Sequence, residues 1–288
     1  MSLLCVAVFG AGCAVSQKRA VAPAQVRAAL DAGKTQLIEL YNAQAHATQT
    51  LNATVRMVPV AGSAYSGVIE QYHDVGGFIL AARPAMIRVI GQAPVVAKDI
   101  FDMVSDGQTF RIYIPSKNRF LVGPTNFDRP AKSPIENLRP QHILDAIFWT
   151  ELGPDAPVLF EEADEATARY YVLTELRSAG AGLEIARKVW FDRADLRVAR
   201  IEIYGPEGRL DSDIAYLDWQ EAGGSATPGS AELAFAREIH ITRPQEDYQL
   251  SLSISKLALN TEIAADRFVL PQPAGTELVR VGEAQAQP

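Results

Sequence analysis

Apolar and polar residues alternate with a period of two over most of this chain, and such alternation is typical of half-buried β-strands. The pattern begins at Leu51 and recurs in short segments that turn-forming residues separate. We count about twelve such segments, and the short turns between them predict antiparallel neighbours in a meander. The sequence Ser105-Asp106-Gly107 joins two apolar runs and predicts a tight hairpin.

Two stretches instead repeat their apolar residues at helical spacing. Residues 22–46 are rich in helix formers and predict one amphipathic helix, which Gly33 weakens without ending it. Residues 140–152 predict a second helix, because Pro140 suits a first helical turn and one face is apolar.

The width of the predicted sheet constrains the fold class. Because strand twist accumulates, a sheet of this many strands must curl or close. Strands occur on both sides of the second helix, so we expect a mainly β (α+β) fold. It would be a single large curved antiparallel sheet, an incomplete β-barrel that the two helices cover. If the helices fill the concave face, an ordinary core results; if they form a lid, an apolar cavity remains that binds apolar ligands. The pattern leaves both arrangements open.

Composition and charge narrow the function. Hydrophobic residues make up 48% and charged residues 21%, which is ordinary for a folded domain. A net charge of −7, with no basic stripe, argues against a nucleic-acid partner. The sequence contains no His-Glu-x-x-His, Gly-x-Ser-x-Gly or phosphate-binding glycine motif. We therefore expect neither an enzyme nor a cofactor or metal site.

The two cysteines, Cys5 and Cys13, both lie near the start of the chain. Residues 2–12 form an uncharged apolar run that is too short to span a bilayer, which takes about 20 residues, but it suits the core of a signal peptide. The run ends in Gly-Ala-Gly before Cys13 and then turns polar, which resembles a bacterial lipobox. That resemblance implies a lipid anchor on Cys13 and export to the outer membrane. A signal peptide with an incidental cysteine, or a short buried segment, is the alternative.

Three segments resemble one known family. Residues 80–88, LAARPAMIR, are similar to an Arg-Pro segment of the periplasmic lipoprotein carrier of the Lol system. Residues 104–115 resemble the Ser-Asp-Gly hairpin of that family, and residues 267–275 resemble its closing segment. The chain thus resembles the LolA/LolB-like superfamily of periplasmic lipoprotein carriers and receptors, as a diverged outer-membrane lipoprotein.

The resemblance implies a half-barrel that shields acyl chains in the periplasm. We therefore expect a lipid-anchored protein on the periplasmic face of the outer membrane of a Gram-negative-type bacterium. It would bind acyl chains of lipoproteins or lipids, for transport or insertion. An envelope protein is a further expected partner. The alternative is a structural or accessory lipoprotein with a filled core. The expected organisation is a signal peptide with lipobox at 1–13, a tether at 14–21, a LolA-like domain at 22–275 and a flexible tail at 276–288.

By the same resemblance, Arg83 is the latch that hydrogen-bonds to the helical lid. A guanidinium on an apolar face needs acceptors, because leaving it unpaired would cost several kcal/mol. An exposed strand residue beside Pro84 is the alternative. Alternation along the strands predicts the residues that line the cavity, or else form a plain core: Phe78, Leu80, Ile87, Val89, Phe101, Met103, Phe110 and Ile112.

Overall fold

The structure, a computed structural model, describes residues 28–63, 68–71, 74–93, 98–125, 139–165, 167–222 and 233–281. In these residues the helices are α1 (Lys34–Ala47) and α3 (Pro140–Ile147), with short 3-10 turns η1 (Pro115–Lys117), η2 (Pro206–Gly208), η3 (Pro244–Glu246) and η4 (Ala265–Phe268). The first seven strands are β1 (Thr50–Ser63), β2 (Val68–Gln71), β3 (Val75–Ala82), β4 (Met86–Gln92), β5 (Asp99–Ser105), β6 (Thr109–Ile114) and β7 (Arg119–Pro124). The others are β8 (Val158–Asp164), β9 (Arg169–Ala179), β10 (Gly182–Asp192), β11 (Val198–Tyr204), β12 (Leu210–Glu221), β13 (Ala234–Arg243), β14 (Tyr248–Leu259) and β15 (Glu277–Arg280).

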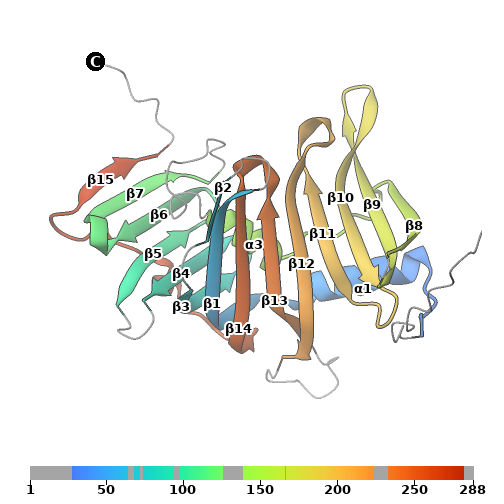
Figure 1. The fold of residues 1–288 in the computed structure, drawn as a ribbon, viewed down its shortest axis with the longest axis horizontal. Coiled ribbons are helices and arrows are strands. Elements are labelled where there is room, and N and C mark those ends of the chain that lie inside the picture. Colours follow the sequence, from blue (N-terminus) through green and yellow to red (C-terminus); the bar gives the residue numbers. More distant parts are fainter. Residues whose placement is uncertain are drawn as a thin grey trace, which may run out of the picture.

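All these strands belong to one sheet, as the sequence predicts. Its order is β15-β7-β6-β5-β4-β3-β1-β14-β13-β12-β11-β10-β9-β8. The short strand β2 is not part of this linear order and pairs with β1. Two meanders, β3 to β7 and β8 to β14, therefore meet at β1, which pairs with β3 on one side and β14 on the other. Figure 1 shows the resulting open, curved sheet, and the predicted mainly β fold is confirmed.

Two details of the sheet differ from the prediction. It has fifteen strands among the described residues rather than about twelve. It is also mixed, because β15 runs parallel to β7 whereas the other pairings are antiparallel. Residues 277–280 therefore belong to the folded domain, and the prediction of a flexible tail from residue 276 is wrong for this part.

The contacts of α3 show that the sheet is curved. This helix touches β4 and β5 in one half of the sheet and β13 in the other. Three strands, β3, β1 and β14, separate these two sets in the sheet order. A short helix can reach both sets only if the sheet bends around it, so α3 lies inside the half-barrel.

The first helix begins later than predicted. Residues 28–33 have no regular secondary structure, and Gly33 is the residue that precedes the helix, with extended backbone angles. The Leu30 amide donates to the Arg193 carbonyl at 2.7 Å, and the Tyr171 hydroxyl donates to the Leu30 carbonyl at 3.3 Å. These contacts use backbone groups that a longer helix would need, so α1 begins only at Lys34.

The second helix ends earlier than predicted, at Ile147 rather than at residue 152. Phe148 leaves the helical region with φ −110° and ψ 89°. The carbonyls that follow bind side chains of other elements, which replaces the pairing that a continued helix would supply. Residues 148–152 are thus a segment without regular secondary structure, and it packs against α1.

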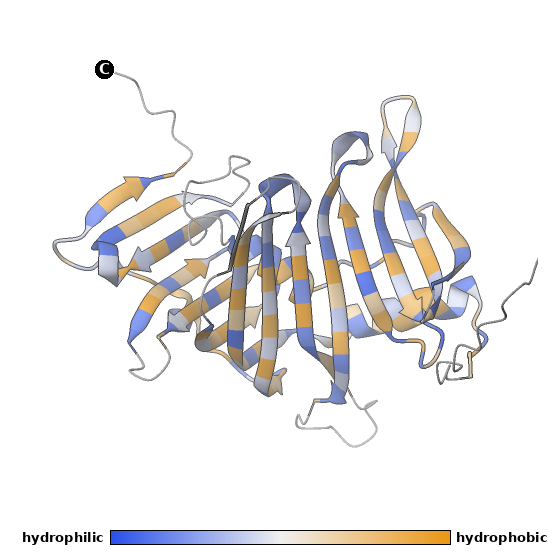
Figure 2. Ribbon diagram, in the orientation of Figure 1, coloured by the Kyte–Doolittle hydropathy of each residue, from blue (hydrophilic) through white to orange (hydrophobic). Residues whose placement is uncertain are grey.

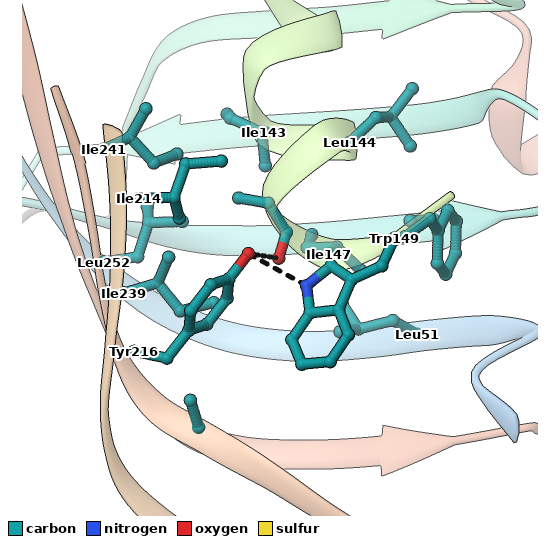
Figure 3. Packing of buried hydrophobic residues seen from close by; sticks show 14 of the residues in the cluster. Leu51, Ile143, Leu144, Ile147, Trp149, Ile214, Tyr216, Ile239, Ile241 and Leu252 are labelled. Carbon is teal, nitrogen blue, oxygen red and sulfur yellow. Dashed lines mark hydrogen bonds between the residues drawn. The ribbon is translucent and has the colours of Figure 1, made fainter. Parts of the chain in front are cut away.

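The apolar residues of the strands and both helices form one core. Alternating apolar stripes run along the strands in Figure 2, and the register aligns them across the sheet. One such row contains Ile79, Val89, Met103 and Ile112, which pair in sequence across neighbouring strands and are at most 1% exposed. In Figure 3, Ile143 and Ile147 of α3 lie among inward-pointing side chains of the sheet. Each buried side chain of this size contributes about 1.5–3 kcal/mol.

Candidate functional site

Arg83 lies in the turn between β3 and β4, next to a cis peptide bond to Pro84. Its Nε donates to the Thr48 carbonyl at 3.0 Å, and its NH2 group donates to the Ala45 carbonyl at 2.8 Å. The same NH2 group donates to the Trp149 carbonyl at 2.9 Å. The last carbonyls of a helix lack partners within it and carry partial negative charge, so a cation is favoured there. Arg83 therefore joins the end of α1 to the segment after α3, and it is not an exposed strand residue.

The segment 148–152 is also bonded to α1 directly. The Tyr41 hydroxyl donates to the Thr150 carbonyl at 3.0 Å. Asn42 makes two bonds to Leu152: its Nδ2 donates to the carbonyl at 3.0 Å, and its Oδ1 accepts from the amide at 2.8 Å. The two helices and the segment therefore form one covering layer, which we call the lid and define as residues 34–47 and 140–152.

A second arginine, Arg187 of β10, holds the lid from the other half of the sheet. Its Nε donates to Glu175 Oε2 of β9 at 2.6 Å, and its NH1 donates to the Tyr41 hydroxyl at 2.8 Å. NH1 also donates to the Thr150 carbonyl, and NH2 donates to the Glu151 carbonyl at 3.1 Å. Arg83 and Arg187 thus bind the consecutive carbonyls of residues 149, 150 and 151.

An aromatic cluster fills the space between these arginines. Trp149 stacks on Tyr41 with ring centroids 5.2 Å apart and an 8° interplanar angle. Trp149 Nε1 donates to the Tyr216 hydroxyl at 2.9 Å, and that hydroxyl donates to the Ala146 carbonyl at 3.0 Å (Figure 3). These polar atoms are buried and satisfied, which fixes the orientation of Trp149 within the lid.

A cavity of about 340 Å³ lies between the lid and strands β9 to β11. It lies within the size range of small-molecule sites, which starts at about 300 Å³. Its lining includes both apolar side chains and the polar groups of Arg187 and Tyr41. The residues that line it are Tyr41, Asp145, Phe148, Trp149, Thr150, Glu151, Glu175, Ala186, Arg187, Ile201 and Ile203.

Burial raises the pKa of two groups at this cavity, the Tyr41 hydroxyl and the Asp145 carboxyl. It raises the pKa of Tyr41 to about 12, so the hydroxyl stays neutral and can both accept and donate hydrogen bonds. Burial also raises the pKa of Asp145, whose carboxylate accepts a hydrogen bond from Gln141 Nε2 at 2.7 Å.

None of the eight residues predicted to line a cavity is among those that line the cavity beside the lid, and the eight do not share one face of the sheet. Six of them point to the concave face and are at most 4% exposed within the core: Ile87, Val89, Phe101, Met103, Phe110 and Ile112. Phe78 and Leu80 alternate with the core residues Ile79 and Ala81, so they point to the opposite face. Phe78 is 41% exposed there. The predicted position of Phe78 and Leu80 on the concave face is wrong, because the alternation along β3 is in the other phase.

Three further points concern the lipid anchor, metal ions and membrane-spanning helices. Cys13, the predicted lipid-attachment residue, lies outside the described residues. Within the described parts of the chain, no three His, Cys, Asp or Glu side chains are placed to share a metal ion. No helix in the same ranges has both the length and the apolar character to cross a membrane.

Comparisons with known proteins agree with this geometry at the level of the fold. No protein-family model matches the chain, and no curated protein sequence matches it. Among solved structures, it is similar to a LolA superfamily protein of Nitrosomonas europaea with a TM-score of 0.51 and 12% identity, over 83% of this chain and 99% of that one. A DUF1329 family protein of Desulfovibrio piger gives a TM-score of 0.51 and 12% identity, over 81% and 94%. The chain therefore has a LolA-like fold, and the fold that the sequence resemblance implies is confirmed.

Proposed function

We propose that this chain binds acyl chains of lipoproteins or lipids in the cavity beneath the lid, and that Arg83 is the latch that holds the lid closed. The protein would act in transport or insertion at the outer membrane. The observation that carries this proposal is the set of three carbonyls that Arg83 binds, two at the end of α1 and one after α3. One side chain thereby joins both parts of the lid.

The energetics favour a lid that moves. An acyl chain gains about 0.8 kcal/mol for each CH₂ group that it buries, so even a modest cavity binds it strongly. A carrier must also release its cargo, and breaking or remaking the bonds of Arg83 provides a way to change the affinity. The cost of leaving a guanidinium without acceptors is several kcal/mol, which is comparable to the binding of several CH₂ groups.

Saturable binding of a fluorescent acyl probe tests the proposal. The full chain carrying Cys13→Ala avoids an attached lipid that would compete with the probe. We expect saturable binding that unlabelled acyl ligands displace, and we expect Arg83→Leu to change the affinity. If no acyl probe binds saturably and Arg83→Leu has no effect, the proposed binding of acyl cargo is contradicted.

The anchor is proposed separately, on the lipobox-like sequence that ends at Cys13. Cells that express the protein are grown with labelled palmitate. We expect the label on the wild-type chain in the outer-membrane fraction and no label on Cys13→Ala. Equal labelling of both chains refutes lipidation at Cys13.

An accessory subunit of an envelope complex, without cargo, is the second candidate. It is favoured by the packing of the first meander, where the six concave-face residues among the predicted lining are at most 4% exposed. A filled core in that half would suit a structural role. Stable co-purification with an envelope protein, combined with no acyl binding, would favour this function over a carrier.

A further inference from the structure

Arg187 is the one guanidinium among the described residues that line the 340 Å³ cavity, and its charge is already compensated. Glu175 accepts from its Nε at 2.6 Å, and the two side chains are only 11% and 16% exposed. Charge-assisted pairs of this geometry are strong, and burial limits their screening by salt. The pair therefore presents hydrogen-bond donors to the cavity without a net positive charge.

The other acidic groups at the cavity make an anionic ligand still less favourable. The lining contains three carboxyl groups, those of Asp145, Glu151 and Glu175, against the single guanidinium of Arg187. A ligand carboxylate placed beside Arg187 would also lie close to Glu175. Like charges at such separations repel, and the repulsion is stronger away from bulk water.

The donors of Arg187 are nevertheless suited to a neutral acceptor. In the closed structure they bind backbone carbonyls of the lid, at Thr150 and at Glu151, and the Tyr41 hydroxyl. A carbonyl oxygen from a ligand has the same chemistry as these backbone groups. If the lid moves away, such a ligand can replace the carbonyls and keep the guanidinium satisfied.

Other residues of the lining suit a hydrocarbon chain. Phe148, Ala186, Ile201 and Ile203 are apolar, and Trp149 lines the cavity from the lid. The cavity therefore combines the polar groups of Arg187 and Tyr41 with an apolar surface from β10 and β11. A molecule that fits both has a neutral carbonyl attached to an alkyl chain.

We propose that Arg187 and Tyr41 bind the ester or amide carbonyl of an acylated cargo, so that the cavity selects acyl esters and amides over free fatty acids. This inference rests on the proposed acyl-binding function and deepens it by naming the group that is recognised. Arg187 is then both a second latch and the cargo contact, since the lid carbonyls and the cargo carbonyl compete for the same N–H groups. Cargo binding at Arg187 thereby loosens the lid.

Displacement of a fluorescent monoacylglycerol from the full chain carrying Cys13→Ala tests this selectivity. The competitors share one straight hydrocarbon chain of equal length and differ only at its end: the methyl ester, the N-methyl amide, the free acid and an alkyl ether without a carbonyl. We expect the ester and the amide to displace the probe at concentrations about tenfold lower than the acid or the ether, which corresponds to about 1.4 kcal/mol. The ester and the amide distinguish glycerolipid-type from N-acylated cargo.

Two variants connect the selectivity to the residues. Glu175→Gln keeps the shape but removes the compensating charge, so the acid should gain affinity and its disadvantage against the ester should vanish or reverse. Arg187→Gln should bring the ester and the amide down to the level of the ether. Arg200→Gln is the matched control, because Arg200 forms a bidentate pair with Asp213 away from the lid. We expect it to leave the order of ligands unchanged.

The outcomes separate the two proposals. If no acyl competitor displaces the probe and the probe itself does not bind, the acyl-binding function fails. If all four competitors bind equally well, or the acid binds best in the wild type, the function stands and the carbonyl selectivity is overturned. Thermal unfolding shows whether each variant is folded; should Arg187→Gln be unfolded, the isosteric Glu175→Gln variant alone decides, and an unchanged disadvantage of the acid contradicts the inference.

Discussion

The guanidinium of Arg83 donates to the backbone carbonyl of Trp149 at 2.9 Å, across 66 residues of sequence. The same nitrogen also binds the Ala45 carbonyl of α1, so one side chain joins the two parts of the lid. This contact connects the sheet to the lid in the half of the molecule opposite to Arg187. Its loss should therefore affect both the stability of the protein and the opening of the lid.

Replacing Arg83 with leucine should lower the free energy of unfolding by about 2–3 kcal/mol, because three carbonyls lose a charged donor. Urea denaturation measures this change, and hydrogen exchange should become faster at the end of α1. Arg56→Leu is the control, since Arg56 is 60% exposed and pairs with Asp74 at the surface. Exposed pairs contribute about 0–1 kcal/mol, so equal effects of the two substitutions would contradict a latch.

Removing the hydroxyl of Tyr216 should destabilise the protein although the ring remains. Tyr216→Phe leaves the Trp149 indole N–H and the Ala146 carbonyl without their partner in a buried site. We expect a loss of about 1–3 kcal/mol in urea denaturation and a shift in tryptophan fluorescence. Tyr204→Phe is the control, because its hydroxyl makes a longer bond of 3.3 Å to Glu202 in a partly buried position. A Tyr216→Phe protein as stable as the control would show that water replaces the hydroxyl.

The sequence predicts the parts of this fold that depend on neighbours along the chain. The turn at Asp106 and Gly107 is one such part, because the Asp106 carboxylate accepts from the amides of the next residues of the same turn. The position of Arg83 against the lid was accessible only through a family resemblance. The ends of the helices were not predictable, since α1 begins where Leu30 binds Arg193, and that contact joins distant segments.

The pairing of Arg187 with Glu175, and therefore the role of Arg187 at the lid, could not be predicted from the sequence. A regular hairpin around Gly180 would place Glu175 opposite Ala186, which offers no partner. An irregularity between Ile185 and Arg187 shifts the register and brings the two charges together. A β-bulge of this kind adds one residue and redirects a side chain, and alternation along one strand contains no signal for it.

The turn glycine Gly107 should tolerate no side chain. Its φ of +89° is unfavourable for other residues, and an added Cβ would lie 2.4 Å from Ala85 Cβ. We expect Gly107→Ala to destabilise the protein by about 1–3 kcal/mol in thermal or urea unfolding. Gly180→Ala is a matched control, because Gly180 has a φ of +56° with nothing within 4 Å of an added Cβ. The difference between the two variants measures the contact with Ala85, and equal losses would show that the turn shifts to accommodate the methyl group.

We expect the buried His142 of α3 to make the stability of the protein depend on pH. Burial holds the pKa of His142 well below its usual range, and the nearby Arg243 and Arg139 lower it further. Glu246 lies 3.8 Å away and would favour protonation, but its carboxylate binds Arg243 at 2.8 Å, which compensates its charge. The buried imidazole is therefore neutral in the folded protein when the unfolded chain already binds a proton.

The sign of the pH dependence follows from these two states. Above a pH of about 6.5, folded and unfolded chains both carry a neutral His142, so the residue adds no slope. Below that value the unfolded chain takes up a proton first, and the free energy of unfolding should fall by up to about 1.4 kcal/mol per pH unit. Urea denaturation between pH 8 and pH 5.5 measures the slope in the wild type and in His142→Gln, which should lack this component. His240→Gln, at a half-exposed surface position, should retain it. A His142→Gln protein with the wild-type slope would mean that other groups, and not this buried histidine of α3, cause the loss of stability in acid.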